Sequence, residues 1–204
     1  MASNPGKTSR VSSTRMLTVT AIMAAIATVL ILYLQFPVIP AVSFLKMDFS
    51  TLPALLASFA LGPLSGAAVC LLKDLINMIY YQDYIGSLCD FVLSVAFVVP
   101  AGLIYRYMRT RKGALIGSLT GAVFMAALSF PLNLFVIYPL YYHFIMPEQA
   151  VLGLYQAIPF IQSIPQGLLV VNVPFTLVKG LIIAAICFVI YKPLSPLLKG
   201  RHKA

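Results

Sequence analysis

Long apolar segments alternate with short polar ones along most of the chain, and this pattern predicts membrane helices. A helix needs about 20 apolar residues to cross the hydrocarbon core of a bilayer. Two of the segments are separated only by the helix-breaking stretch Leu61-Gly62-Pro63. The predicted helices are 16–34, 51–61, 64–80, 87–107, 113–140 and 167–191. We expect the fifth helix to bend near Pro131.

Composition places the chain among integral membrane proteins. Hydrophobic residues make up 61% of it and charged residues only 9%, whereas soluble domains carry roughly 25% charged residues. We therefore predict an all-α fold, a six-transmembrane-helix bundle that forms a single membrane domain over residues 16–192. A polar N-terminal tail, 1–15, is predicted to be disordered, and a basic C-terminal tail covers 193–204.

The positive charges predict the orientation of the chain rather than a nucleic-acid partner. Eleven of the fourteen basic residues lie in three short segments: Lys7, Arg10 and Arg15; Arg106, Arg109, Arg111 and Lys112; and Lys192, Lys199, Arg201 and Lys203. Such clusters stay on the cytoplasmic side of a membrane. With six spans, both termini are then cytoplasmic in a multi-pass protein of the bacterial plasma membrane, and loops 35–50, 81–86 and 141–166 lie outside.

Polar residues recur on helical faces inside the apolar segments, where burying them is costly. Spacings of three, four and seven residues place them in stripes. The candidates for ligand binding in the helices are Asn77, Ser87, Asp90, Phe91, Asn133, Tyr138, Asn172, Phe175 and Lys179. The predicted helix directions put most of them between mid-membrane and the outer surface, so we expect a pocket that opens outward.

Two alternatives to ligand binding stay open. Asn and Ser side chains also fasten membrane helices together, and a Lys73–Asp90 ion pair is as compatible with the sequence as a ligand role for Lys73. A membrane assembly protein without a small ligand would have no pocket, and its Lys179 and Asp90 would pair with each other or with partner helices. No catalytic triad, carboxylate pair or phosphate loop is present and both histidines are isolated, so we expect neither an enzyme nor a metal site.

Five stretches of sequence carry a resemblance to a known family. They are Phe44–Pro53 (FLKMDFSTLP), Phe59–Gly66 (FALGPLSG), Leu72–Asn77 (LKDLIN), Leu132–Tyr141 (LNLFVIYPLY) and Val173–Gly180 (VPFTLVKG). Together they resemble the substrate-binding S components of energy-coupling factor (ECF) vitamin transporters, and the last two resemble the riboflavin-specific type. The resemblance spans about residues 15–192, nearly the whole chain.

The resemblance implies a protein that binds a vitamin from outside the cell and has no cofactor of its own. In that family the S component works with a membrane scaffold, the T component, and with two cytoplasmic subunits that use ATP. Small side chains on the first helix meet the scaffold. Here Ala21 and Ala25 have that spacing, and small side chains let helices approach closely.

The resemblance also implies roles for individual residues toward riboflavin. An Asn amide donates and accepts at once, so Asn133 suits the uracil-like edge of the flavin. Lys179 suits a ring carbonyl or a hydroxyl of the ribityl chain, while Leu45, Phe91 and Phe175 are expected to flank the ring.

Two aspartates keep more than one interpretation. Asp48 either accepts hydrogen bonds from ribityl hydroxyls or caps the second helix. Asp90 stands where the family often has a neutral residue, and its charge disfavours the phosphorylated flavin FMN unless Lys73 neutralises it. An S component for FMN or for another vitamin therefore remains an alternative.

Overall fold

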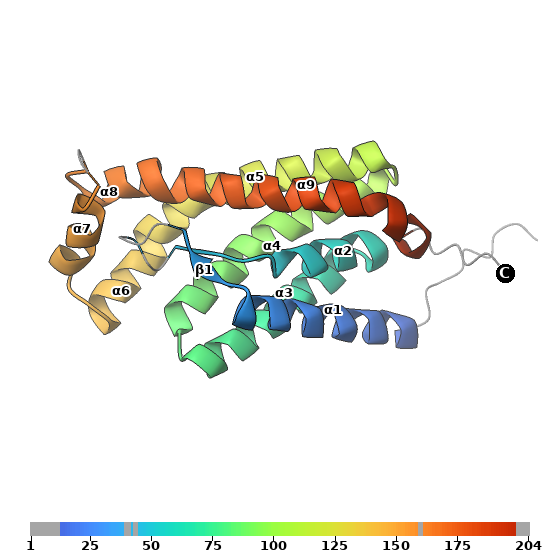
Figure 1. Cartoon of the computed structure of the whole chain (residues 1–204), viewed down its shortest axis with the longest axis horizontal. Coiled ribbons are helices and arrows are strands. Elements are labelled where there is room, and N and C mark those ends of the chain that lie inside the picture. Colours follow the sequence, from blue (N-terminus) through green and yellow to red (C-terminus); the bar gives the residue numbers. More distant parts are fainter. Residues whose placement is uncertain (1–12, 39–41, 43–44, 159–160, 199–204) are drawn as a thin grey trace, which may run out of the picture.

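The computed structural model describes the chain except for residues 1–12, 39–41, 43–44, 159–160 and 199–204, and it describes only the backbone of residues 192–198. The described part is a bundle of helices (Figure 1). The long helices are α1 Ser13–Tyr33, α3 Pro63–Tyr81, α4 Tyr84–Tyr107, α5 Arg111–Leu132 and α9 Val173–Leu198. The short helices are α2 Thr51–Leu61, α6 Tyr138–Phe144, α7 Glu148–Gln156 and α8 Ile164–Gly167.

Five helical runs of the described residues are long and apolar enough to cross a membrane. They are Ser13–Tyr33, Pro63–Tyr81, Tyr84–Tyr107, Arg111–Phe144 and Ile164–Tyr191. Helix α2 is apolar but has only 11 residues, which at 1.5 Å per residue is about 16 Å long. It lies in the middle of the bundle with most of its residues buried. The all-helical membrane fold is thus confirmed, whereas α2 alone is too short for the predicted sixth span.

The break between the second and third predicted helices lies where the sequence indicates it. Helix α2 ends at Leu61, Gly62 has a φ of +111°, and Pro63 begins α3. Only glycine adopts that backbone conformation at little cost, and proline is favoured at the first position of a helix. The pair therefore redirects the chain in a single residue.

The two longest helical runs each contain a π-helical turn, at η2 Asn133–Ile137 and η3 Leu168–Asn172. A proline follows each turn, Pro139 and Pro174. In an α-helix a proline leaves the carbonyl four residues earlier without a donor. Here the turns use hydrogen bonds five residues apart, from Tyr138 N–H to the Asn133 carbonyl and from Val173 N–H to the Leu168 carbonyl. The bend that was expected near Pro131 comes slightly later: Pro131 stays within α5, and the chain leaves the α5 axis beyond the π turn η2 (Figure 1).

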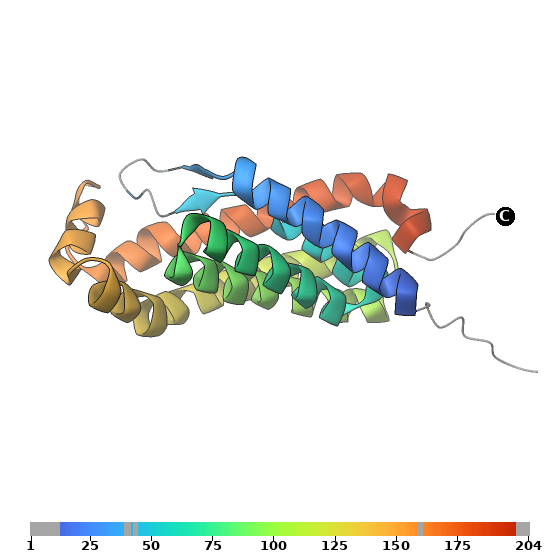
Figure 2. The same cartoon turned by 90° about the horizontal axis from the view of Figure 1, so that it is seen from below.

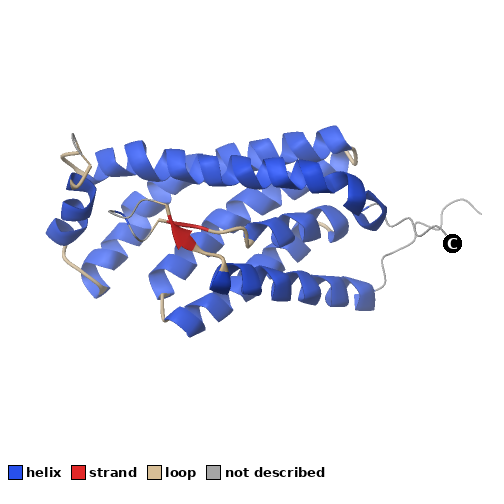
Figure 3. Ribbon diagram, in the orientation of Figure 1, coloured by secondary structure: helices blue, strands red, loops and turns tan. Residues whose placement is uncertain are grey.

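Two of the predicted loops contain regular structure. Segment 35–50 includes a two-stranded antiparallel ribbon of two residues per strand, β1 Phe36–Pro37 and β2 Lys46–Met47 (Figure 3). Segment 141–166 contains the end of α6, all of α7 and the start of α8. The loop prediction there was wrong because prolines can start helices as well as end them: Pro147 immediately precedes α7. Most of the predicted tail 1–15 falls outside the described residues.

The bundle has two distinct ends. Helix α1 begins, α4 turns into α5, and α9 ends at the same end, while α6, α7 and α8 gather at the other (Figures 1 and 2). A buried cluster around α2 fills one half of the bundle, and a second apolar cluster packs α6 to α8 against the ends of α5 and α9. The polar residues of the candidate site lie between these two clusters.

Candidate functional site

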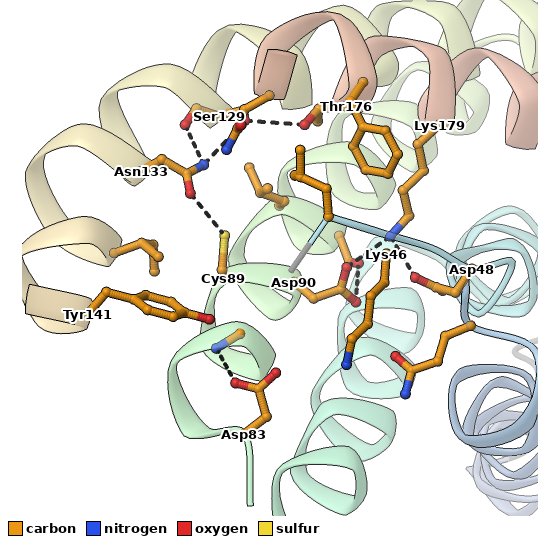
Figure 4. Close-up of a pocket in the computed structure, with 18 of the residues that line it drawn as sticks. Lys46, Asp48, Asp83, Cys89, Asp90, Ser129, Asn133, Tyr141, Thr176 and Lys179 are labelled. Carbon is orange, nitrogen blue, oxygen red and sulfur yellow. Dashed lines mark hydrogen bonds and ion pairs between the residues drawn. The ribbon is translucent and has the colours of Figure 1, made fainter. Parts of the chain in front are cut away.

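A pocket opens between α3, α4, α5 and α9, beside the β1–β2 ribbon (Figure 4). The cavity has a volume of about 150 Å³, roughly ten times what a single water needs. Nine predicted site residues line it: Leu45, Asp48, Asn77, Asp90, Asn133, Tyr138, Asn172, Phe175 and Lys179. The pocket is thus large enough for a small organic molecule and is lined by both apolar and polar groups.

Lys179 connects the ribbon side of the pocket to α4. Its Nζ lies 2.7 Å from Asp48 Oδ2 and 3.0 Å from Asp90 Oδ1. An ammonium group has three donors, so these two ion pairs leave one N–H of Lys179 for a ligand. The pairing of Lys179 with Asp90 is what a membrane assembly protein without a ligand would show. Such a protein would have no pocket, however, and a pocket lies beside this ion pair.

Lys73 lies deeper and holds the other oxygen of Asp90. Its side chain is fully buried, with Nζ 2.5 Å from Asp90 Oδ2 and 2.7 Å from Asp74 Oδ1. Of the two alternatives for Lys73, the structure shows the ion pair with Asp90, and Lys73 is not among the pocket-lining residues. Three carboxylates and two ammonium groups form one continuous network across α3, α4, α9 and the segment before α2.

Asp48 orders the turn before α2 instead of capping that helix. Its Oδ1 accepts from the backbone N–H of Ser50 at 2.9 Å and from the Ser50 hydroxyl. Ser50 is the N-cap residue of α2, and no side chain makes a capping hydrogen bond at this end of the helix. The capping interpretation was wrong because the Asp48 side chain accepts from the N–H of Ser50, which lies before the first helical residue, Thr51. Its second oxygen accepts from Lys179.

Asn133 reaches the pocket from the start of the π turn η2. Its Nδ2 donates to the Ser129 carbonyl at 2.7 Å and to the Ser129 hydroxyl at 3.3 Å. Its Oδ1 receives only the weak donor Cys89 Sγ, at 3.8 Å. The Ser129 hydroxyl in turn bonds that of Thr176 on α9, at 3.2 Å. The amide is held on its donor side and keeps most of its acceptor capacity toward the pocket (Figure 4).

Asn77 is a second amide with unused capacity. Its Nδ2 donates to the Ser87 hydroxyl at 2.9 Å, while its buried Oδ1 has no hydrogen-bond partner within the described residues. A buried polar atom without a partner costs about 1–3 kcal/mol. Because Asn77 lines the pocket, a ligand donor is the natural partner for this oxygen.

Two predicted site residues do not line the pocket. Phe91 packs against the apolar cluster around α2 and is not among the residues that line this pocket, so its expected place beside a ligand ring stays a prediction. Helical periodicity predicts which residues share a face of a helix, but it does not predict which neighbouring helix or pocket each of those residues faces. Ser87 is buried and contacts Asn77, and it can act on a ligand only through that residue.

The prediction also missed several pocket residues. Thr176 lines the pocket, as its place on the same helical stripe as Phe175 and Lys179 indicates. Cys89, Ser129 and Met125 line it as well. Small or apolar residues of this kind occur throughout membrane helices, so the sequence holds no signal that would single them out. Tyr141 and Met146 come from the segment that was predicted to be a loop.

Two of the small residues of the first helix face away from the bundle. Ala21 and Ala25 are exposed on α1, whereas Ala24 and Ala27 are buried against the bundle. The pair predicted to contact a scaffold therefore lies on the face of α1 that the rest of this chain leaves uncovered.

A membrane-embedded helical bundle with a polar and aromatic pocket is typical of the ligand-binding subunit of a transport system rather than of an enzyme, and a family model agrees with that class. The model described as "ECF transporter, substrate-specific component" matches residues 15–191. The chain belongs to this family of substrate-specific ECF transporter components.

Individual relatives match over nearly their full lengths. The chain is 29% identical over 187 residues to the riboflavin transporter RibU of Staphylococcus aureus, covering 91% of this chain and 92% of the relative. It is 33% identical over 192 residues to RibU of Streptococcus thermophilus, covering 92% and 86%. Riboflavin transporter FmnP of Bacillus subtilis is 29% identical over 193 residues, covering 92% and 96%.

A solved structure agrees with the family assignment. It is described as the S component of a bacterial ECF transporter and is 29% identical in sequence. The two structures superpose with a TM-score of 0.73 over 92% of this chain and 99% of the other. The arrangement of the helices is therefore that of an S component.

Proposed function

We propose that this chain is the riboflavin-binding S component of an ECF importer and holds the vitamin in the pocket between α3, α4, α5 and α9. One observation carries the proposal: the pocket presents fixed amides with unused hydrogen-bonding capacity between apolar side chains. The three relatives described above are named as riboflavin transporters and match over at least 86% of their lengths. Both features agree with a flat, polar-edged ligand.

The chemistry of riboflavin fits the lining residues. Its tricyclic ring has broad apolar faces, which Leu45 and Phe175 flank, and burial contributes about 25 cal/mol per Å² of apolar area. Its uracil-like edge carries donors and acceptors that match the amides of Asn133 and Asn172. The remaining N–H of Lys179 donates to a ring carbonyl or to a ribityl hydroxyl.

The hydroxyls of the ribityl chain suit the acceptors on the α3–α4 side of the pocket. Asn77 offers its unpartnered Oδ1, and the carboxylates of Asp48 and Asp90 have further lone pairs. Ser87 fixes the orientation of Asn77 without touching the ligand.

A phosphorylated flavin fits this pocket less well. The lining residues include three carboxylates, Asp48, Asp83 and Asp90, against the two ammonium groups of Lys46 and Lys179. The fully buried Lys73 is shared between Asp74 and Asp90, so it does not offset the excess. The phosphate of FMN would add like charge to a site that is already negative.

The basic residues support an outward-facing pocket. The α4–α5 turn carries Arg106, Arg109, Arg111 and Lys112, and it lies at the same end of the bundle as the start of α1, which carries Arg15 (Figure 1). The positive-inside rule makes that end cytoplasmic. The pocket lies toward the opposite end, where α6 to α8 gather. Helix α2 and the segment before it together make the sixth crossing, so that both termini are cytoplasmic.

The chain depends on partners for energy. In the proposed importer, a membrane T component and two cytoplasmic ATPases use ATP to drive release of the vitamin into the cell. The exposed Ala21 and Ala25 on α1 form the contact with the T component, since small residues allow close helix packing.

Ala21→Trp is expected to abolish riboflavin uptake by cells that carry the complete transporter, while the isolated protein still binds riboflavin. The bulky ring blocks the approach of the partner helix but points away from the bundle, because Ala21 is exposed. Ile26→Trp is the control and should leave uptake near normal, because Ile26 is exposed on α1 but lies about 100° or more around the helix from Ala21 and Ala25. Loss of uptake and binding together in Ala21→Trp would indicate a folding defect and would contradict the assignment of this face.

The absorbance spectrum of the protein purified in mild detergent tests the proposal cheaply. A bound flavin gives a yellow protein whose ligand can be released and identified. A different vitamin in the released material would keep the S-component class and contradict riboflavin.

A further inference from the structure

Two tyrosines and one asparagine form a closed hydrogen-bonded ring at the end of the pocket near α6 to α8. Tyr155 O–H donates to Asn172 Oδ1 at 2.6 Å, and Asn172 Nδ2 donates to the Tyr138 oxygen at 3.4 Å. The hydroxyls of Tyr138 and Tyr155 bond each other. Since the Tyr155 proton is committed to Asn172, Tyr138 is the donor in this last bond.

The ring fixes one amide and leaves half of its capacity unused. A side-chain amide has two N–H donors and two acceptor lone pairs. The ring takes one donor and one acceptor from Asn172, so one N–H and one lone pair remain. Asn172 lines the pocket. The N–H and the lone pair that remain point away from each other, so the ring fixes which end of the amide donates and which end accepts. Without the ring, the amide would be free to turn over and exchange them.

Tyr155 takes part in this ring from outside the pocket. It lies on α7, is fully buried and is not among the lining residues. Its aromatic ring stacks on that of Tyr138, with centroids 6.4 Å apart, and it packs so closely on α8 that a Cβ added to Gly167 would come within 2.7 Å of it. Burial raises the pKa of Tyr155 above its ordinary value, so its hydroxyl stays protonated and can donate.

We propose that Tyr155 is a positioning residue for the ligand, which acts by fixing the Asn172 amide in the orientation in which its remaining hydrogen-bonding group meets a partner atom of the flavin. The inference rests on the proposed riboflavin function and adds to it a residue that never touches the vitamin. It also gives α7 a role in the affinity for riboflavin. This helix lies outside the membrane spans, and its Tyr155 orients the amide of Asn172 in the π turn that precedes α9.

Tyr155→Phe tests the inference because it removes one hydroxyl and keeps the aromatic ring. The expected result is a five- to tenfold rise in the Kd for riboflavin, measured by fluorescence quenching. Tyr142→Phe is the matched control: Tyr142 packs edge-on against the same Tyr138 ring but does not belong to the hydrogen-bonded ring, and its Kd should stay within about twofold of wild type.

A double-variant cycle separates positioning from a general structural role. In an Asn172→Ala background, Tyr155→Phe should weaken binding no further, because the amide that it orients is gone. An equal loss in both backgrounds would show that Tyr155 only supports the fold, and an unchanged Kd for Tyr155→Phe alone would also overturn the inference. If wild-type protein itself fails to bind riboflavin, the proposed function fails and this inference fails with it.

Discussion

Lys179→Met is expected to raise the Kd for riboflavin by more than tenfold and also to lower the thermal stability of the protein. Lys179 is the only ammonium group bonded to Asp48 and one of two bonded to Asp90 among the described residues. Removing one partner of a buried ion pair typically costs about 3–5 kcal/mol, because the other charge is left uncompensated. The sequence alone predicts the loss of binding, but the ion pairs add the loss of stability.

A second variant distinguishes the two effects. Lys179→Met combined with Asp48→Asn removes one charge of each sign, and the amide oxygen introduced at position 48 can still accept from Ser50. The melting temperature should return toward the wild-type value, whereas riboflavin binding should remain weak relative to Asp48→Asn alone. Recovery of both properties would mean that Lys179 only balances the charge of Asp48 and makes no contact with riboflavin.

Asn133→Ala is expected to raise the Kd for riboflavin tenfold or more, with little change in thermal stability. The Asn133 acceptor meets only a weak thiol donor in the free protein. The substitution also removes the two bonds from Nδ2 to Ser129, but the Ser129 carbonyl keeps the backbone N–H of residue 133 and its hydroxyl keeps Thr176, so little stability is lost. In the complex it leaves a polar atom of the flavin edge without a partner, which costs about 1–3 kcal/mol. A factor of ten corresponds to about 1.4 kcal/mol.

Ser118→Ala is the control for Asn133→Ala. Ser118 is also a buried polar residue of α5, but its hydroxyl bonds the Ala114 carbonyl within the same helix and it does not line the pocket. Riboflavin should bind this variant normally. Normal binding by Asn133→Ala as well would place the uracil-like edge of the flavin elsewhere.

Local patterns in the sequence were enough to predict the long membrane helices and the short helix α2. The long apolar runs and the Gly62-Pro63 pair have direct physical meaning, and the boundaries of α2 and α3 follow from them. The Lys73–Asp90 pair was also predictable, because two opposite charges on consecutive apolar helices have few other partners.

Contacts between distant segments could not be predicted in the same way. Lys179 and Asp48 are 131 residues apart, and nothing in either neighbourhood indicates the other. The π turns that carry Asn133 and Asn172 depend on how the helix accommodates Pro139 and Pro174. Tyr155 was missed because a segment with several prolines was taken for a loop, although it forms α7 and contributes a buried hydroxyl to the ring with Asn172.

Equilibrium titration of the purified wild-type protein with riboflavin tests the central claim most directly. The account predicts quenching of flavin fluorescence that saturates at one riboflavin per chain, with weaker binding of FMN under the same conditions. A protein free of bound flavin that leaves riboflavin fluorescence unchanged throughout the titration would contradict the claim that this pocket holds riboflavin.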